Sequence, residues 1–343
     1  MRCVEKAYAK INLTLAVGEK RLDGYHEVVS VMQRVSLCDT LTAERTDSGI
    51  SLACSDPSLP AGEENLAHRA AAVFFRETGI AGGAALTLEK RIPSQAGLGG
   101  GSSDAASALL ALRKLYAPAL SDTELETMAA ALGSDVPFFI RGGTQLATGR
   151  GEVLSPLPSL TDGWFVIVKP AESFSTPAMY RRLDELPPAC TPPLPPLQGG
   201  LPALAAGLFN RFEAAIPAGS DMWDIKARLA ACGALASLLS GSGSAVFGLF
   251  DTETAARAAV EALRPAWPEI FLARPVSKPK TPSTMQLILQ GRCFYAYIHM
   301  EKTGDRTPSG AGCHPALGCG FPPPAGDPEP QDDPPPRHRQ LQQ

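Results

Sequence analysis

A glycine-rich segment in the first half of the chain carries the clearest chemical signal. It reads Pro93-Ser94-Gln95-Ala96-Gly97-Leu98-Gly99-Gly100-Gly101-Ser102-Ser103-Asp104. Glycines let backbone N–H groups approach an anion without obstruction by Cβ, and the start of a following helix adds unpaired N–H groups and positive potential. The segment therefore predicts a loop that binds a polyphosphate.

Three other interpretations of this loop fit less well. A P-loop needs a lysine directly after its glycines, and none follows here. A dinucleotide fingerprint belongs at the first βα turn of a chain, whereas this loop arrives near residue 97 and its acidic candidate, Asp122, stands at a helix start. A flexible linker would not usually run straight into an amphipathic helix.

Two charged residues could act on a phosphoryl group. Lys10 and Asn12 alternate with apolar neighbours, so both face one side of an expected strand. A lysine aimed into a cleft can stabilise charge on a phosphoryl group or an alkoxide, although a lone strand lysine is more often solvated. Asp135 lies among apolar residues, where a carboxylate is costly to bury unpaired, and Lys10 is its natural partner. The alternative for Asp135 is a turn or helix cap.

An aromatic pair follows an Asp-Gly turn near the N-terminus. A planar base needs a flat apolar face and a hydrogen-bonding partner at its edge, and Tyr25 with His26 supplies both. The alternative is a hairpin tip with an incidental aromatic residue.

Strands and helices must position these side chains. Period-two alternation predicts strands at 6–18, 28–37 and 85–92, joined early by the Asp-Gly turn. Helices are expected after Asn65, after Ser102-Ser103-Asp104, and after a Ser121/Glu124 capping box. A linker at 155–163 precedes a buried strand at 164–170, and a Pro-rich surface excursion is expected at 187–202. Further elements are helices at 210–216, 224–236 and 252–264 and a strand at 245–250.

The loop matches the pattern P-x-x-x-G-L-G-[GS]-[GS]-S-[SA], and in this the chain resembles the GHMP kinase superfamily. The form G-L-G-G-G-S-S-D-A-A, the A-K-I-N-L strand and the D-G-Y-H motif resemble the branch that phosphorylates a cytidyl alcohol. Three later segments also resemble family motifs, in the expected order: 133–139, 175–180 and 240–244. The resemblance covers about residues 1–276.

The resemblance implies an α+β, two-domain GHMP kinase fold, with an S5-like N-terminal domain, a ferredoxin-like C-terminal domain and the active site in the cleft between them. The expected domains are 1–155, which holds the ATP loop, and 156–276. Residues 277–343 form a Pro-rich tail whose composition predicts disorder.

The resemblance also implies an activity. It is the transfer of the γ-phosphoryl group of ATP to the 2-hydroxyl of a cytidyl alcohol, in the non-mevalonate isoprenoid precursor pathway. Asp135 would accept the hydroxyl proton, Lys10 would offset charge, and residues 93–103 would hold ATP with Mg²⁺, for which Ser103 is a candidate ligand. The substrate-binding residues would be Asn12, Tyr25, His26, Thr176 and Tyr180, with the two tyrosines on opposite faces of the cytosine.

Two alternative functions stay open at this point. Another superfamily member, such as a homoserine or mevalonate-type kinase, would give Tyr25, His26 and Tyr180 no role. A nucleotide-binding sensor that has lost its chemistry would not need both Lys10 and Asp135.

Composition narrows the class of partner. The 343 residues carry a formal net charge of −4 and a sequence pI of about 5.8, which argues against a nucleic-acid surface. Hydrophobic residues make up 44% of the chain, yet none of its apolar runs reaches membrane-spanning length, and no secretion signal is recognised. We expect a cytoplasmic monomer or homodimer.

The eight cysteines lack the spacing of a disulfide framework and are expected to be reduced thiols. Cys313-His314 with Cys319 lacks the four ligands of a zinc site, so no metal site is assigned there.

Overall fold

The computed structural model describes residues 1–277 of the chain. The expected tail from residue 278 onward, with its cysteines and the Cys313-His314 pair, lies outside the described residues. Within the described part of the chain, no helix is long and apolar enough to span a membrane. Five cysteines of that part carry free thiols, as expected: Cys3, Cys38, Cys54, Cys190 and Cys232.

The N-terminal half is built on a long antiparallel hairpin. Gly24, with φ of 84°, turns the chain between the two strands, and the middle of each strand is buried on both faces, at residues 9–17 and 30–35. The sheet has the order β3-β4-β2-β1-β8, with β5 paired to β2 and β6. Its strands are β1 (Arg2–Lys20), β2 (His26–Thr46), β3 (Gly49–Cys54), β4 (Gly83–Glu89), β5 (Thr144–Thr148), β6 (Val153–Pro156) and β8 (Phe209–Asn210).

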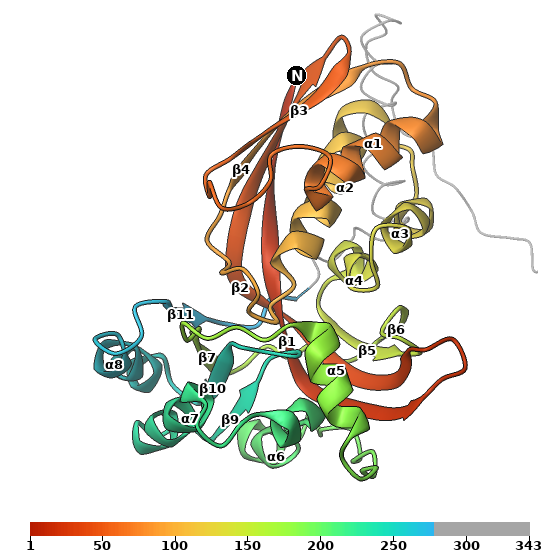
Figure 1. The fold of residues 1–343 in the computed structure, drawn as a ribbon. Helices are drawn as coiled ribbons and strands as arrows, with labels where there is room; N and C mark the ends of the chain where they lie inside the picture. The colour runs from red at the N-terminus through yellow and green to blue at the C-terminus, as the bar shows by residue number, and fades with distance from the viewer. Residues whose placement is uncertain (278–343) are drawn as a thin grey trace, which may run out of the picture. The chain divides into compact units, whose positions relative to one another are not determined.

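Helices α1 to α4 gather beside the long strands (Figure 1). They are α1 (Leu66–Thr78), α2 (Gly100–Tyr116), α3 (Asp122–Ala130) and α4 (Val136–Arg141). Their apolar faces and the sheet share one core, which includes Leu41, Phe74, Leu109 and Phe138. The expected Asn65 cap and the Ser121/Glu124 capping box are both present.

The expected start of the second helix was wrong. The helix begins at Gly100, with Gly99 in a left-handed conformation at the N-cap position, so Ser103 and Asp104 lie inside its first turns. Their side chains do not cap the helix because they are engaged elsewhere: the Ser103 hydroxyl donates to the Tyr8 carbonyl, and Asp104 accepts from Lys90.

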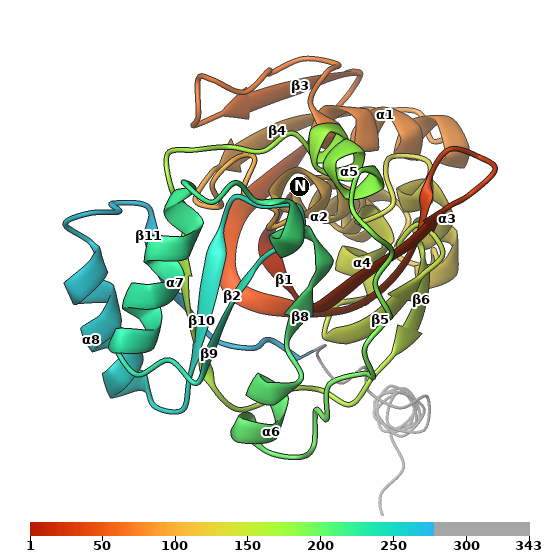
Figure 2. The ribbon, with the colours of Figure 1, turned by 60° about the horizontal axis from the view of Figure 1, so that its bottom comes forward.

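The C-terminal half carries a four-stranded antiparallel sheet of order β11-β7-β10-β9, covered by α7 and α8 (Figure 2). The order of these elements along the chain, β-α-β-β-α-β, is that of a ferredoxin-like domain and confirms the predicted fold class. The elements are β7 (Trp164–Val168), α5 (Thr176–Asp184), α6 (Leu201–Ala206), the 3₁₀ helix η1 (Arg211–Ala215), α7 (Asp221–Ala231), β9 (Ala236–Leu239), β10 (Val246–Phe250), α8 (Glu253–Leu263) and β11 (Ile270–Ala273).

Two helix predictions in this half need correction. The helix expected at 224–236 ends at Ala231, because Gly233 turns the chain with φ of 88° and Ala236 already pairs in β9. The helix expected at 210–216 is a short 3₁₀ helix. The Pro-rich excursion is confirmed as surface chain without a strand, up to the start of α6.

Backbone pairing joins the two halves. β8 lies parallel to β1, with Thr14 opposite Phe209. The chain after β11 bridges β2 at Val35 and Pro275, and the amide of Val276 donates to the carbonyl of Arg34 at 2.9 Å. The boundary expected at 155/156 stays a prediction.

Candidate active site

The glycine-rich loop, residues 93–102, is held by hydrogen bonds from two separate parts of the chain, β1 and residues 240–245. Its Leu98 carbonyl accepts from the amide of Lys10 in β1 at 2.9 Å, and its Ala96 carbonyl accepts from the amide of Ala245 at 3.1 Å. The Ser240 hydroxyl donates to the Gly97 carbonyl at 3.0 Å. The loop is therefore fixed in shape by both halves of the molecule.

Glycine is required at position 97 for two reasons. Its φ of 72° favours glycine, and a Cβ built there would lie 2.0 Å from the carbonyl oxygen of Ser240. The backbone of the glycine-rich loop thus contacts the backbone of residues 240–244.

A cavity of about 450 Å³ opens along this loop. The expected loop residues from Pro93 to Ser102 line it, whereas Ser103 does not and is 1% exposed. Its other wall is formed by Leu59, Pro60, Glu64, Asn65, Leu66, Lys90, Ile92 and Asp104. This space suits a nucleotide with its phosphates against the loop.

Lys10 and Asp135 meet, as the sequence predicted. The Lys10 Nζ atom lies 3.7 Å from Asp135 Oδ2, although the two residues come from β1 and the start of α4. The lysine side chain is 6% exposed and the carboxylate 35% exposed, so the pair joins a buried cation to an accessible carboxylate. A carboxylate placed this way can accept a proton from a bound hydroxyl.

Asp135 occupies the N-cap position of α4 but does not cap it. Its side chain makes no capping hydrogen bond, and its backbone is helical, with φ of −82° and ψ of −14°. The structure therefore favours the charged pair with Lys10 over the capping alternative.

Asn12 holds Lys10 in place. Its Oδ1 accepts from Lys10 Nζ at 2.6 Å, while its Nδ2 donates to the Ser30 hydroxyl at 2.7 Å. Ser30 in turn donates to the Thr14 carbonyl. Because Asn12 is 2% exposed, its amide is used within the fold.

The third glycine segment, residues 240–244, lies against Lys10 and the glycine-rich loop. A Cβ on Gly241 would lie 3.4 Å from Lys10 Nζ. The hydroxyls of Ser242 and Thr176 are hydrogen-bonded at 2.8 Å, which brings the first turn of α5 to this segment. Asn210 fixes the segment by donating to the carbonyls of Leu239 and Gly241.

The expected base-binding residues lie where the β1–β2 hairpin approaches α5. The His26 and Tyr180 rings are stacked, with centroids 5.0 Å apart and an interplanar angle of 20°. Asp184, the last residue of α5, accepts from His26 Nε2 at 2.7 Å and from Lys20 Nζ at 3.2 Å. These contacts with His26 and Lys20 hold the pKa of Asp184 below its usual range.

The two tyrosines are placed differently. Tyr180 is largely buried, which raises its pKa to about 12, and the Asp135 carboxylate adds to that shift. Tyr25 is 55% exposed, with the Arg150 guanidinium 4.8 Å from its ring centroid. The structure brings Tyr180 against His26 and Phe212 rather than against Tyr25. The tyrosine sandwich stays a prediction.

Sequence reasoning missed several residues of the site. Asp184 contacts His26 but lies outside every motif that the sequence offered. Asn65 was read only as a helix cap, yet it also lines the nucleotide cavity. Lys90 ends a strand, where a lysine is usually solvated, and nothing in its spacing marks it as buried.

The fold and these motifs coincide with known family models. Residues 65–143 match the GHMP kinases N terminal domain, and residues 198–269 match the GHMP kinases C terminal model. The chain belongs to the GHMP kinase family.

Individual proteins of the family differ in how similar they are to this chain. A protein from Moorella thermoacetica named 4-diphosphocytidyl-2-C-methyl-D-erythritol kinase is 43% identical over 278 residues, covering 78% of this chain and 97% of that protein. A crystal structure of 4-(cytidine 5'-diphospho)-2C-methyl-D-erythritol kinase is 40% identical, with a TM-score of 0.70 over 80% of this chain and all of that one. A mevalonate kinase structure has a TM-score of 0.64 over 80% of this chain and 100% of that one, but only 13% identity, so it shows the fold alone.

Proposed function

We propose that this chain transfers the γ-phosphoryl group of ATP to the 2-hydroxyl of 4-diphosphocytidyl-2-C-methyl-D-erythritol, giving the 2-phosphate and ADP in the non-mevalonate isoprenoid precursor pathway. The observation that carries the proposal is the Lys10–Asp135 pair beside a glycine-lined cavity. The 40–43% identity to kinases of that name, against 13% to a mevalonate kinase, supports the acceptor.

The reaction needs a positioned hydroxyl, neutralised phosphate charge and little covalent chemistry from the protein. Asp135 accepts the proton of the 2-hydroxyl as its oxygen bonds to the γ-phosphorus and the bond to ADP breaks. Lys10 lies close enough to pair with the Asp135 carboxylate and to offset charge on the transferred group. The amides of the glycine-rich loop bind the phosphates.

The acceptor side uses Tyr180, His26, Tyr25 and Thr176. Tyr180 and His26 offer a stacked aromatic surface to the cytosine, and Tyr25 supplies a second face from the hairpin. Asn12 was expected to touch the substrate, but its burial and its bond to Lys10 favour a positioning role.

Magnesium fits this site as a companion of the nucleotide. Among the described residues, no group of three or more His, Cys, Asp or Glu side chains could hold a metal ion alone, and Mg²⁺ commonly keeps waters and uses substrate phosphates as ligands. Bound in this way, it would neutralise phosphate charge. Ser102 lines the cavity and is a better candidate ligand than Ser103, whose buried hydroxyl donates to Tyr8.

The remaining alternatives are other acceptors and a sensor without chemistry. A homoserine or mevalonate-type acceptor would leave the His26–Tyr180 stack unused, and a sensor would leave the Lys10–Asp135 pair unused. The cytoplasmic location and the monomeric or homodimeric state stay predictions.

A coupled ADP-release assay tests the proposal, with the cytidyl alcohol, homoserine and mevalonate offered in parallel. We expect turnover with the cytidyl alcohol alone, and a loss of about 10²–10⁴-fold in kcat for Asp135→Asn. Faster turnover of homoserine or mevalonate would exclude the proposed acceptor. Unchanged turnover by a folded Asp135→Asn enzyme would exclude the assigned base.

A further inference from the structure

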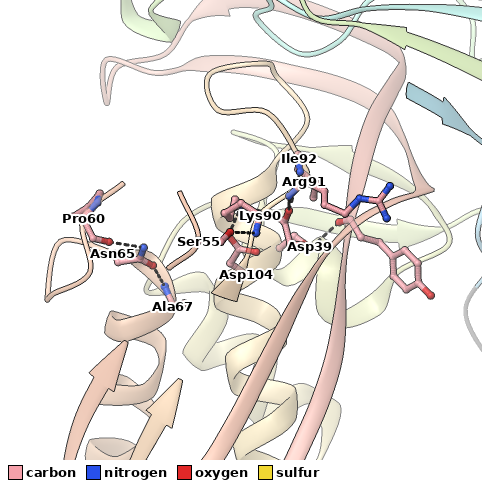
Figure 3. Close-up of polar contacts among 11 residues, drawn as sticks. Asp39, Ser55, Pro60, Asn65, Ala67, Lys90, Arg91, Ile92 and Asp104 are labelled. Carbon is pink, nitrogen blue, oxygen red and sulfur yellow. Dashed lines mark hydrogen bonds and ion pairs between the residues drawn. The ribbon is translucent and has the colours of Figure 1, made fainter. Parts of the chain in front are cut away.

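Three buried charged side chains lie directly behind the glycine-rich loop and have no part in the mechanism above. They are Asp39 from β2, Lys90 from the residue after β4, and Asp104 from α2 (Figure 3). Their side chains are 0%, 8% and 4% exposed, respectively. Burying three charges is costly, so their arrangement calls for a physical reason.

Lys90 bridges the two carboxylates. Its Nζ atom lies 2.5 Å from Asp39 Oδ2 and 2.7 Å from Asp104 Oδ2. One ammonium thus connects the central strand of the sheet to the helix that follows the loop.

Asp39 also holds the chain that enters the loop. Its Oδ1 accepts from the backbone amides of Arg91 at 2.5 Å and Ile92 at 2.8 Å, immediately before the loop begins at Pro93. Asp104 lies in the helix that leaves the loop. The two ends of the loop are therefore tied to each other through side chains, independently of the bonds along the loop itself.

Two residues of this cluster, Lys90 and Asp104, line the cavity along the glycine-rich loop, and Ile92 lines it beside them. A Cβ built on Gly100, the first residue of α2, would lie 3.1 Å from Ile92 Cγ2 and 3.5 Å from Lys90 Nζ. A displacement of Lys90 or Ile92 would therefore also displace the start of α2.

A contribution to stability does not explain why the carboxyl group of Asp104 is buried. Its Oδ1 is buried without a hydrogen-bond partner, and burial raises its pKa to about 7, although Lys90 acts in the opposite direction. A carboxyl group in this condition opposes folding at neutral pH. Its place beside the cavity favours a role in shaping the site.

We propose that Asp39, Lys90 and Asp104 form a positioning triad that fixes the two ends of the glycine-rich loop and thereby sets its affinity for the phosphates of ATP. The proposal rests on the proposed kinase function. It predicts an effect on ATP binding with little effect on the acceptor or on the chemical step.

Asp104→Ala is the most informative variant, because it removes the helix side of the triad and leaves Lys90 paired with Asp39. We expect the Kd for ATP, measured by calorimetry without acceptor, and the KM for ATP to rise about tenfold, which corresponds to losing one hydrogen bond to a charged group. The kcat at saturating ATP and the KM for the cytidyl alcohol should stay within about twofold. Amide hydrogen exchange in residues 97–102 should accelerate.

Two further variants separate positioning from general stability. Asp104→Asn keeps an oxygen that accepts from Lys90 and should restore ATP affinity to within about twofold of the original enzyme. Asp221→Ala, which removes an exposed carboxylate at the start of α7, is the matched control and should change neither Kd nor exchange.

Defined results would overturn the proposal. A lower melting temperature with unchanged ATP affinity for Asp104→Ala would show a purely structural role, and an Asp104→Asn enzyme as impaired as Asp104→Ala would show that charge rather than position matters. If the original enzyme bound ATP but did not phosphorylate the cytidyl alcohol, the proposed function would fail, while calorimetry would still test the triad.

Discussion

The two sides of the proposed active site are built from different kinds of groups. On the nucleotide side, backbone groups of the loop are bonded to β1 and to the third glycine segment, and buried charges lie behind them. On the acceptor side, the surface consists of side chains from the tip of the β1–β2 hairpin and from α5. Tyr25, at the hairpin tip, is 55% exposed.

This difference separates affinity for phosphate from choice of acceptor. Backbone amides bind any triphosphate and tolerate little change in shape, because the loop lies in contact with other backbone. On the acceptor side, contact with the substrate depends on the side chains themselves, the exposed Tyr25 and the largely buried His26 and Tyr180, which can be exchanged without altering the loop. Substitutions on the two sides should therefore produce distinct kinetic signatures.

The largest effect is expected at the junction of the two sides. Lys10→Met keeps the length of the side chain but removes the charge beside Asp135, so kcat should fall about 10²–10³-fold with both KM values little changed. Steady-state kinetics with each substrate varied measures this. Lys6→Met, in an exposed part of the same strand, is the control. A loss confined to KM for ATP would place Lys10 on the nucleotide side.

Gly97→Ala should distort the glycine-rich loop and weaken the binding of ATP. The added Cβ would lie 2.0 Å from the Ser240 carbonyl and would meet an unfavourable φ, at a combined cost of about 3 kcal/mol. We expect the KM for ATP to rise about 100-fold, which is the same free energy expressed as affinity. Gly219→Ala, where a Cβ meets nothing within 4 Å, is the control. Normal ATP affinity for Gly97→Ala would contradict the rigid-loop account.

Asp104→Asn should change the dependence of stability on pH. The carboxyl group has a pKa raised from 3.8 to about 7, so the folded chain holds a proton that the unfolded chain has lost between those values. Stability from this group is therefore greatest at low pH, falls as pH rises toward about 7, and is level above.

The measurement is chemical unfolding of both proteins at pH 5 and pH 8. The difference in unfolding free energy between the two pH values should be about 2–3 kcal/mol more favourable to pH 5 in the original chain than in the variant. Equal differences in the two proteins would mean that Asp104 is ionised throughout.

The smallest effect is expected on the acceptor side. Tyr180→Ala removes one stacking face, worth about 1–2 kcal/mol, so the KM for the cytidyl alcohol should rise about 5- to 30-fold while the KM for ATP stays constant. Tyr180→Phe keeps the ring and should behave like the original enzyme. A matching rise in KM for ATP would show that the two sides are not separable.

The sequence was most informative where backbone chemistry restricts residue type. Local conformation determines the glycine-rich loop, the Asp-Gly turn and the Asn65 and Ser121 caps. Because local conformation depends on neighbouring residues, these features could be predicted from short stretches of sequence. The meeting of Lys10 with Asp135 was also predicted, because both residues lie in segments that resemble family motifs and because a carboxylate among apolar residues needs a nearby cation.

The features that the sequence did not predict depend on contacts between residues that are far apart in the chain. The start of α2 was misplaced because Ser103 and Asp104 look like caps but are used by Tyr8 and Lys90, residues that are close only in the fold. Asp184 is linked to His26 across 158 positions, and no local pattern marks such a pair. The 3₁₀ turn at η1 follows a two-residue strand whose partner is β1.

The parallel pairing of β8 with β1 has a consequence for biosynthesis. The strand that carries Lys10 cannot complete its hydrogen bonding until residues 209–210 have been made. Until then its edge is open, and an open strand edge can pair with another chain. A truncated first half should therefore aggregate more readily than the whole chain, and the order of synthesis links completion of the catalytic strand to arrival of the second half.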